Sequence, residues 1–141
     1  MAKTLAEHTK KYFKEQFEIV VPDAGAEYLV KDLGGKHFKK VRKEYDGDKI
    51  AYRDVESLTC DFDVAGKNFL VLDDMISTGN TMVNDLEKLK ECGAKKLCCG
   101  TIHGLFLYNC LDKLRKFTDC IFATDTIPSP QSAVTIKNDL P

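Results

Sequence analysis

The sequence predicts an α/β fold, a mostly parallel sheet flanked by helices. Segments with strand-like character alternate along the chain with segments whose apolar residues recur at helical spacing. Residues 68–72 form a short, largely apolar run between polar neighbours, as in a strand buried on both faces of a parallel sheet. No repeat, low-complexity segment or linker divides the chain, so we expect a single domain over residues 1–141.

The N-terminal half predicts helices, one buried strand and a basic hairpin. Periodicity, Pro22 and the glycine positions set the boundaries of these elements. In order, we expect a helix over residues 3–17, a strand over 18–21, a turn over 23–25, a helix over 26–33 closed by Gly34-Gly35, a strand over 37–44, a hairpin turn at Asp46-Gly47-Asp48, and an ambiguous strand and edge segment over 50–63.

The C-terminal half gives the clearer pattern. Apolar residues Met82, Leu86 and Leu89 mark one face of a helix that Cys92-Gly93 ends. The expected elements are a strand over residues 68–72, a loop from Asp73, this helix, a strand over 96–102, a short helix over 111–117, a strand over 120–124 and a last strand over 134–136. Because ligands bind at the carboxyl ends of such strands, the segments at Asp23, Asp73 and His103 should meet at one edge.

Composition excludes several classes of protein. The net charge of −1 gives no electrostatic basis for nucleic-acid binding, and no apolar run is long enough to span a bilayer. The N-terminus lacks the apolar stretch of a signal peptide, so we expect a cytoplasmic protein whose six cysteines are reduced. The cysteines contain no Cys-x-x-Cys pair and do not cluster with histidines, which argues against a zinc site.

The segment after Leu72 carries the strongest chemical signal. A helix start preceded by Ser77, Thr78 and Gly79 offers unpaired backbone N–H groups, hydroxyl donors and a close backbone approach, which together suit a phosphate. Thr81 adds a further hydroxyl, and Asn80 tolerates a left-handed conformation.

Two neighbouring acids precede this phosphate loop. Asp73 and Asp74 repel phosphate, so we expect them to bind vicinal ribose hydroxyls, directly or through a divalent cation. A plain helix cap with acidic surface residues would explain Ser77 or Thr78, but not two acids at the end of a buried strand.

The run from Leu70 to Thr81 resembles the phosphoribosyl diphosphate motif of type I phosphoribosyltransferases, and its Asp-Asp-Met-Ile start is most similar to ribose-phosphate diphosphokinases. The resemblance extends from about Ala2 to near the C-terminus. Further segments that resemble this family, in the same order, are Val20-Val21-Pro22-Asp23-Ala24-Gly25, the Lys40-Val41-Arg42 pair position, Thr101-Ile102-His103-Gly104-Leu105-Phe106 and Thr124-Asp125-Thr126-Ile127-Pro128.

This resemblance implies a fold, a reaction and site residues. Diphosphate would pass from Mg-ATP to ribose 5-phosphate, giving phosphoribosyl diphosphate and AMP. Lys40 and Arg42, on a flexible basic hairpin, would stabilise charge on the transferred group, and Asp23 would help to hold Mg²⁺. The alternatives are a solvated hairpin for the first two and a plain turn residue for Asp23. For His103 the resemblance implies a supporting role rather than acid–base chemistry.

Departures from the family leave alternatives open. The chain resembles only the C-terminal half of these synthetases, so we expect a homo-oligomer or pairing with the missing N-terminal half that supplies much of the ATP site. Ser77 stands where synthetases usually carry Asp, Asn80 replaces a usual Gly, and Ala26 replaces a second Gly. A stand-alone phosphoribosyltransferase and a non-catalytic synthetase-associated subunit are therefore the alternative functions.

Overall fold

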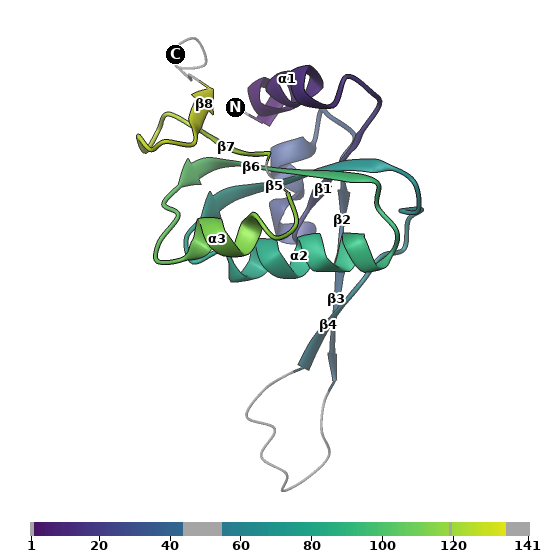
Figure 1. Cartoon of the computed structure of the whole chain (residues 1–141). Coiled ribbons are helices and arrows are strands. Elements are labelled where there is room, and N and C mark those ends of the chain that lie inside the picture. Colours follow the sequence, from purple (N-terminus) through teal and green to yellow (C-terminus); the bar gives the residue numbers. More distant parts are fainter. Residues whose placement is uncertain (1, 44–54, 119, 135–141) are drawn as a thin grey trace, which may run out of the picture.

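The computed structural model describes residues 2–43, 55–118 and 120–134, and it confirms the predicted α/β class (Figure 1). Six strands form one parallel sheet in the order β2-β1-β5-β6-β7-β8, and β3 and β4 form a separate antiparallel pair. The elements are α1 (Ala2–Phe13), β1 (Glu18–Val21), the 3₁₀ helix η1 (Ala24–Val30), β2 (Lys36–His37), β3 (Lys39–Lys43), β4 (Val55–Thr59), β5 (Asn68–Ile76), α2 (Asn80–Glu91), β6 (Lys96–Gly104), α3 (Cys110–Leu114), β7 (Ile121–Thr124) and β8 (Ser132–Val134).

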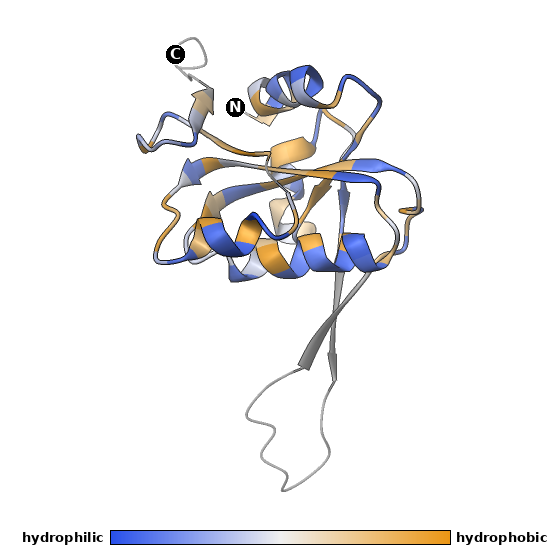
Figure 2. Ribbon diagram, in the orientation of Figure 1, coloured by the Kyte–Doolittle hydropathy of each residue, from blue (hydrophilic) through white to orange (hydrophobic). Residues whose placement is uncertain are grey.

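The central strand β5 divides the core into two layers. Its alternate residues point to opposite faces of the sheet. Leu70 and Leu72 belong to a buried cluster with residues of α1 and η1, whereas Phe69 and Val71 belong to a second cluster with residues of α2 and α3. Figure 2 shows apolar and polar residues alternating along the helices, which therefore bury one side against the sheet.

Helix α1 ends earlier than the sequence predicts. Leu5, Thr9 and Phe13 lie on its buried face at helical spacing. The helix stops at Phe13, and Lys14 adopts a left-handed conformation with φ 54°. Phe17 still packs against the core from outside the helix, which explains why periodicity alone extended the prediction to residue 17.

The predicted helix over residues 26–33 is instead the 3₁₀ helix η1 over Ala24–Val30. It begins two residues earlier because the Asp23 carboxylate caps it, accepting a hydrogen bond from the Ala26 N–H at 3.2 Å. Asp23 itself directly follows β1 and the residue Pro22. Capping therefore fixes Asp23 at the carboxyl edge of the sheet.

The hairpin of β3 and β4 projects away from the main sheet (Figure 1). Its base is anchored by Phe38, which is buried, and Phe62, whose ring centroid lies 6.1 Å from that of Phe38 and 6.0 Å from that of Phe69 in β5. The hairpin prediction is confirmed for the paired strands. The predicted turn at residues 46–48 and the last two residues of the strand predicted over 134–136 lie outside the described residues.

Two strands extend beyond their predicted ends. The prediction that all six cysteines are reduced is wrong for two of them. β5 continues to Ile76 and β6 to Gly104, since the two strands stay in register along that whole length. Cys98 and Cys120 form a disulfide between neighbouring strand positions rather than remaining reduced. In the described part of the chain, no helix has the length and apolar character needed to cross a membrane.

Candidate functional site

The phosphate loop lies between β5 and α2 at the carboxyl edge of the sheet. Gly79 has φ 86°, a left-handed conformation, and α2 begins at Asn80. The Val83 N–H donates to the Gly79 carbonyl, so the N–H groups of Asn80, Thr81 and Met82 precede the first turn's regular hydrogen bond. No side chain of the described residues caps this helix start, which leaves a positive helix terminus open to an anion.

A small hollow of about 130 Å³ adjoins this helix start. It is much smaller than a pocket that encloses a whole drug-sized ligand, about 300 Å³ or more. The hollow therefore suits a phosphate group, with the rest of a ligand lying outside it. Its lining residues are Asp73, Met75, Ile76, Ser77, Thr78, Gly79, Asn80, Thr81 and Met82.

Two requirements fix glycine at position 79. Its conformation is one that L side chains rarely adopt, and a Cβ added there would lie 2.5 Å from the Cys110 Sγ atom. Asn80, which the sequence analysis described as tolerant of a left-handed conformation, is instead the first helical residue, and Gly79 takes the left-handed position. The Lys113 ammonium instead donates a hydrogen bond to the Asn80 side-chain oxygen at 3.3 Å.

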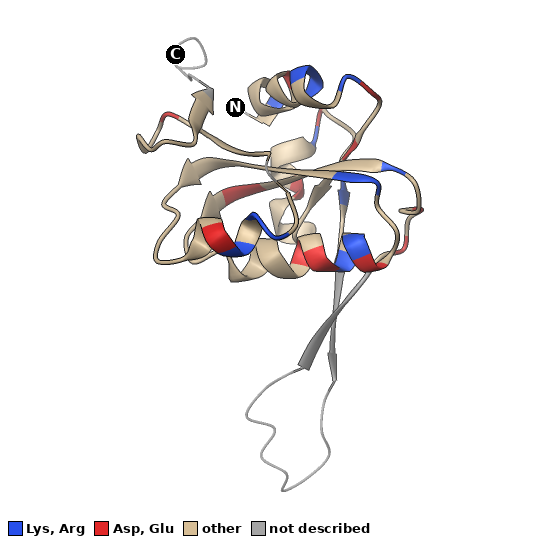
Figure 3. Ribbon diagram, viewed as in Figure 1, with Lys and Arg blue, Asp and Glu red and all other residues tan. Residues whose placement is uncertain are grey.

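Asp73 and Asp74 lie within β5 rather than in the predicted loop, and they show as a red segment near the end of that strand in Figure 3. Strand alternation turns Asp73 toward the α2 side, where it lines the small hollow. Asp74 turns toward η1, where its Oδ2 atom accepts a hydrogen bond from the Tyr28 hydroxyl at 3.2 Å. The acidic pair therefore bridges both faces of the strand end.

The pKa of Asp73 is raised to about 7, mainly by burial and then by its neighbour Asp74, with Asp23 adding to the effect. The Asp74 N–H partly offsets this rise by donating to the Asp73 Oδ1 atom at 2.8 Å. A bound cation or hydroxyl donors would relieve the repulsion between these carboxylates.

Asp23 and Asp73 are the carboxylates at this edge of the sheet that could hold a Mg²⁺ ion. Asp23 follows β1 and Asp73 lies in the adjacent strand β5, so their charges act on each other. In the part of the chain that the structure describes, no three acidic, histidine or cysteine side chains form a complete metal cage. Mg²⁺ commonly uses one or two carboxylates and completes its shell with waters and substrate phosphates.

The structure places Lys40 and Arg42 on β3, where their backbones pair with Leu58 and Glu56. Their side chains are outside the described residues. His103 lies at the end of β6, and its Nδ1 atom is 2.8 Å from the Thr126 hydroxyl, which also donates to the Ile102 carbonyl. This network ties β6 to the segment after β7, in agreement with the expected supporting role of His103.

Sequence reasoning missed Tyr28 and Cys110. Tyr28 comes five residues after Asp23 on η1, so its place beside the carboxyl edge was the available signal. Cys110 lies beneath Gly79 through a contact between segments 31 residues apart, which no local pattern indicates.

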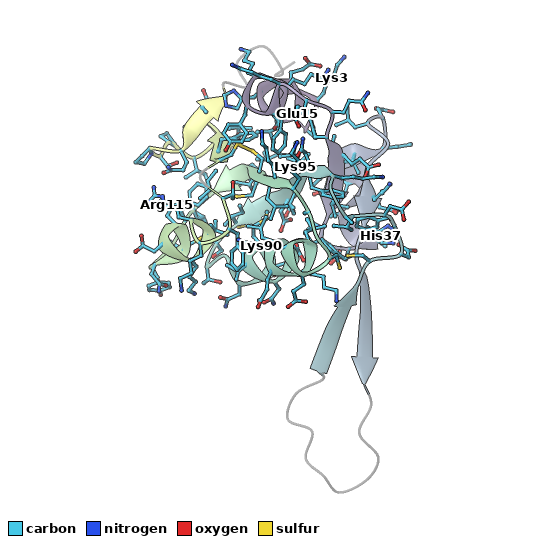
Figure 4. The ribbon with its side chains drawn as sticks, turned by 45° about the vertical axis from the view of Figure 1, so that its right-hand side comes forward. Lys3, Glu15, His37, Lys90, Lys95 and Arg115 are labelled. Atoms are coloured by element: carbon cyan, nitrogen blue, oxygen red, sulfur yellow. A yellow bond between two sulfur atoms is a disulfide. The ribbon has the colours of Figure 1, made fainter. Side chains whose placement is uncertain are left out.

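A wider hollow of about 1340 Å³ lies at the opposite edge of the sheet, beside α1 and the starts of β1 and β5. Its charged side chains form ion pairs: Glu18 pairs with Lys36 at 2.9 Å and with Lys67 at 3.5 Å. Glu15 pairs with Lys95 at 3.3 Å, and Figure 4 labels these two residues. We therefore place the candidate site at the smaller hollow, where acidic groups and an open helix terminus meet.

The phosphoribosyl transferase domain family matches residues 5–116 of the chain. The chain belongs to this family. The match spans the phosphate loop and both acids, and it confirms the family expected from the motifs.

The chain is similar to ribose-phosphate pyrophosphokinases over most of its own length. The chain is 35% identical over 136 residues to a ribose-phosphate pyrophosphokinase of Thermococcus kodakarensis, covering 92% of this chain and 47% of the relative. It is 36% identical over 126 residues to the enzyme of the same name from Thermoplasma volcanium, covering 86% and 42%. The chain thus spans a little under half the length of these relatives.

Solved structures show the same fold. A phosphoribosylpyrophosphate synthetase from Mycobacterium smegmatis matches with a TM-score of 0.67 at 23% identity, covering 96% of this chain and 46% of that one. An adenine phosphoribosyltransferase matches with a TM-score of 0.61 at 18% identity, covering 86% and 76%. The fold is therefore that of type I phosphoribosyltransferases.

Proposed function

We propose that this chain is the catalytic C-terminal part, or a half-length form, of a ribose-phosphate diphosphokinase. It would transfer diphosphate from Mg-ATP to ribose 5-phosphate. The observation that carries the proposal is the open start of α2 beside the acidic pair, in a chain related over 92% of its length to a ribose-phosphate pyrophosphokinase.

In this proposal the substrate is held at three points. The 5-phosphate lies in the small hollow, bound by Ser77, Thr78, Gly79, Asn80 and Thr81. Asp73 and Asp74 accept hydrogen bonds from the ribose hydroxyls. Asp23 helps to hold Mg²⁺, which when bound would neutralise charge on the ATP phosphates.

The chemical step requires positioning rather than a protein nucleophile. The oxygen of the ribose 1-hydroxyl attacks the β-phosphorus of ATP, the bond from that phosphorus to the α-phosphate oxygen breaks, AMP leaves and one proton is released. Lys40 and Arg42 would stabilise the charge that builds on the transferred group, with Arg42 able to form two parallel hydrogen bonds. ATP would also need a second copy of this chain or the missing N-terminal half.

The test is a phosphorus NMR assay with ribose 5-phosphate, MgCl₂ and ATP. Formation of AMP together with phosphoribosyl diphosphate supports the proposal for the chain alone. Binding of ribose 5-phosphate without turnover supports a catalytic half that needs its partner. Absence of any ribose 5-phosphate binding would overturn the proposal. Replacing Lys40 and Arg42 by Ala should lower turnover by at least about 100-fold, as loss of charge stabilisation does, and leave ribose 5-phosphate affinity within about twofold.

A stand-alone phosphoribosyltransferase is the second candidate. It is favoured by the hydroxyl residue Ser77 in the phosphate loop and by the match to an adenine phosphoribosyltransferase fold. Turnover of phosphoribosyl diphosphate with a nucleobase, and not with ATP, would select this function. A non-catalytic subunit is distinguished by Asp74→Asn, which should leave the activity of a partner enzyme unchanged in that case.

A further inference from the structure

A tyrosine from a separate element contacts the acidic pair. The Tyr28 hydroxyl donates to the Asp74 Oδ2 atom at 3.2 Å, across 46 residues of sequence. Tyr28 is 64% exposed, whereas its neighbours Ala26 and Val30 form the buried side of η1. Tyr28 is therefore not a core residue, and its hydroxyl lies against the acidic pair.

The electrostatics of the contact are those of a neutral donor beside carboxylates. Partial burial raises the pKa of Tyr28, and the charges of Asp74 and Asp73 raise it further. The hydroxyl therefore stays protonated over the physiological range and remains a hydrogen-bond donor.

The contact also fixes the direction of Asp74. Leu72 and Asp74 point to the η1 side of β5, while Asp73 points to the hollow on the other side. Because Tyr28 engages Oδ2, rotation of the carboxylate is restricted, and Oδ1 is the oxygen that would accept from a sugar at the strand end. A sugar whose phosphate lies in the hollow then meets two acids held from opposite faces of the sheet.

We propose that Tyr28 is a positioning and specificity-determining residue for the sugar: it orients Asp74 to accept a vicinal ribose hydroxyl. The inference rests on the proposed binding of ribose 5-phosphate. The hydroxyl that Asp74 accepts in this proposal is the 2-hydroxyl, so 2-deoxyribose 5-phosphate, which lacks it, gains less from an oriented Asp74. Tyr28 therefore contributes to discrimination between ribose 5-phosphate and 2-deoxyribose 5-phosphate.

The experiment compares dissociation constants of both sugar phosphates, with MgCl₂, for the unmodified chain and for Tyr28→Phe. The matched control is Tyr12→Phe, which removes the hydroxyl of another half-exposed tyrosine, on α1, whose ring packs on Phe13. We expect Tyr28→Phe to weaken ribose 5-phosphate binding about 5- to 10-fold, as loss of a partly exposed hydrogen bond to a charged group does. Binding of 2-deoxyribose 5-phosphate should change less than about twofold.

If Tyr28 had a purely structural role, Tyr28→Phe would lower the affinities for both sugar phosphates together and would shift the urea unfolding midpoint. The ratio of the affinities for ribose 5-phosphate and 2-deoxyribose 5-phosphate is therefore the deciding readout. In an Asp74→Asn background, Tyr28→Phe should have no further effect on that ratio. An unchanged ratio for Tyr28→Phe, with normal ribose 5-phosphate binding by the unmodified chain, overturns the role of Tyr28 alone. Failure of the unmodified chain to bind either sugar phosphate overturns the proposed function and this inference together.

Discussion

At the scale of single residues, Gly79 is constrained by both backbone and packing. Replacement by Ala would force a left-handed alanine, costing about 1–2 kcal/mol, and would press a methyl group against Cys110, adding about 1–3 kcal/mol. We expect Gly79→Ala to lower the free energy of unfolding by about 2–5 kcal/mol, measured by urea denaturation, and to abolish phosphate binding.

Gly66→Ala is the matched control, because Gly66 also has positive φ, at 76°, but a Cβ there meets nothing within 4 Å. Gly66→Ala should lower the free energy of unfolding only by the backbone cost, about 1–2 kcal/mol. Adding Cys110→Ala to Gly79→Ala removes the Sγ atom that the new methyl group would meet. The double variant should therefore recover the part of the free energy of unfolding that the close contact costs. Equal losses for the two glycine variants would contradict the close contact with Cys110.

Asp73 predicts a pH dependence of stability. Its folded pKa of about 7 lies above its ordinary value of 3.8, so between these pH values the folded chain binds the proton that the unfolded chain has lost. Asp73 therefore stabilises the fold fully below about pH 4, and this contribution falls as pH rises to about 7. Asp73→Asn should be more stable than the unmodified chain at pH 8, with the difference shrinking toward pH 4.5, as measured by urea midpoints.

An exposed aspartate provides the comparison for this prediction. Asp32→Asn makes the same substitution at an exposed position and therefore controls for the effect of the substitution itself. Magnesium should reduce the effect at Asp73, since a cation replaces the proton. A constant offset between Asp73→Asn and the unmodified chain at all pH values would show that burial does not raise the pKa of Asp73.

At the scale of elements, sequence pattern predicted the strands best where burial is continuous. Strand β1 matches its predicted bounds, and the run from Asn68 was recognised because both faces of β5 are buried. Periodicity could not show that β5 continues through Asp73 and Asp74, because polar residues at a sheet edge look like loop. The phosphate loop could be predicted because its residues are adjacent in the sequence, and their chemistry alone indicates a phosphate site.

The missed features depend on contacts between distant segments. Whether residues 24–30 form a 3₁₀ or an α-helix depends on the capping by Asp23 and on packing against the sheet, which propensity does not contain. Tyr28 and Asp74 meet only after β1 and β5 pair. The same holds for Cys98 and Cys120, which parallel pairing of β6 and β7 brings together.

The Cys98–Cys120 disulfide links two neighbouring strand segments across 22 residues. Closing a loop of that size should stabilise the fold by about 3 kcal/mol. We expect dithiothreitol, or the double variant Cys98→Ser/Cys120→Ser, to lower the free energy of unfolding by about that amount. Mass spectrometry of unreduced peptides identifies the bond. Full thiol labelling of both cysteines in the untreated, unfolded chain would contradict the disulfide. It would show that both cysteines are reduced, as the sequence predicts.

At the scale of the whole molecule, the candidate site connects the two halves of the core. Asp74 and Tyr28 belong to the side of the sheet covered by α1 and η1, whereas Asp73 and the phosphate loop belong to the side covered by α2. A ligand that contacts both sides can stay bound only while both layers remain packed on β5. Its binding energy should therefore act on global unfolding rather than on local opening.

Ribose 5-phosphate with MgCl₂ should stabilise the native state by about 2.7 kcal/mol at 100 times its dissociation constant. Hydrogen exchange should show the slowest amides of β5 and β6 gaining this protection equally, because these amides exchange through global unfolding. At one fixed ligand concentration, Asp74→Asn should reduce the gain through weaker binding, and inorganic phosphate, which reaches only the loop, should give a smaller gain. Protection confined to the start of α2 would show that the ligand stays bound when the strands open, and that it does not link the two layers.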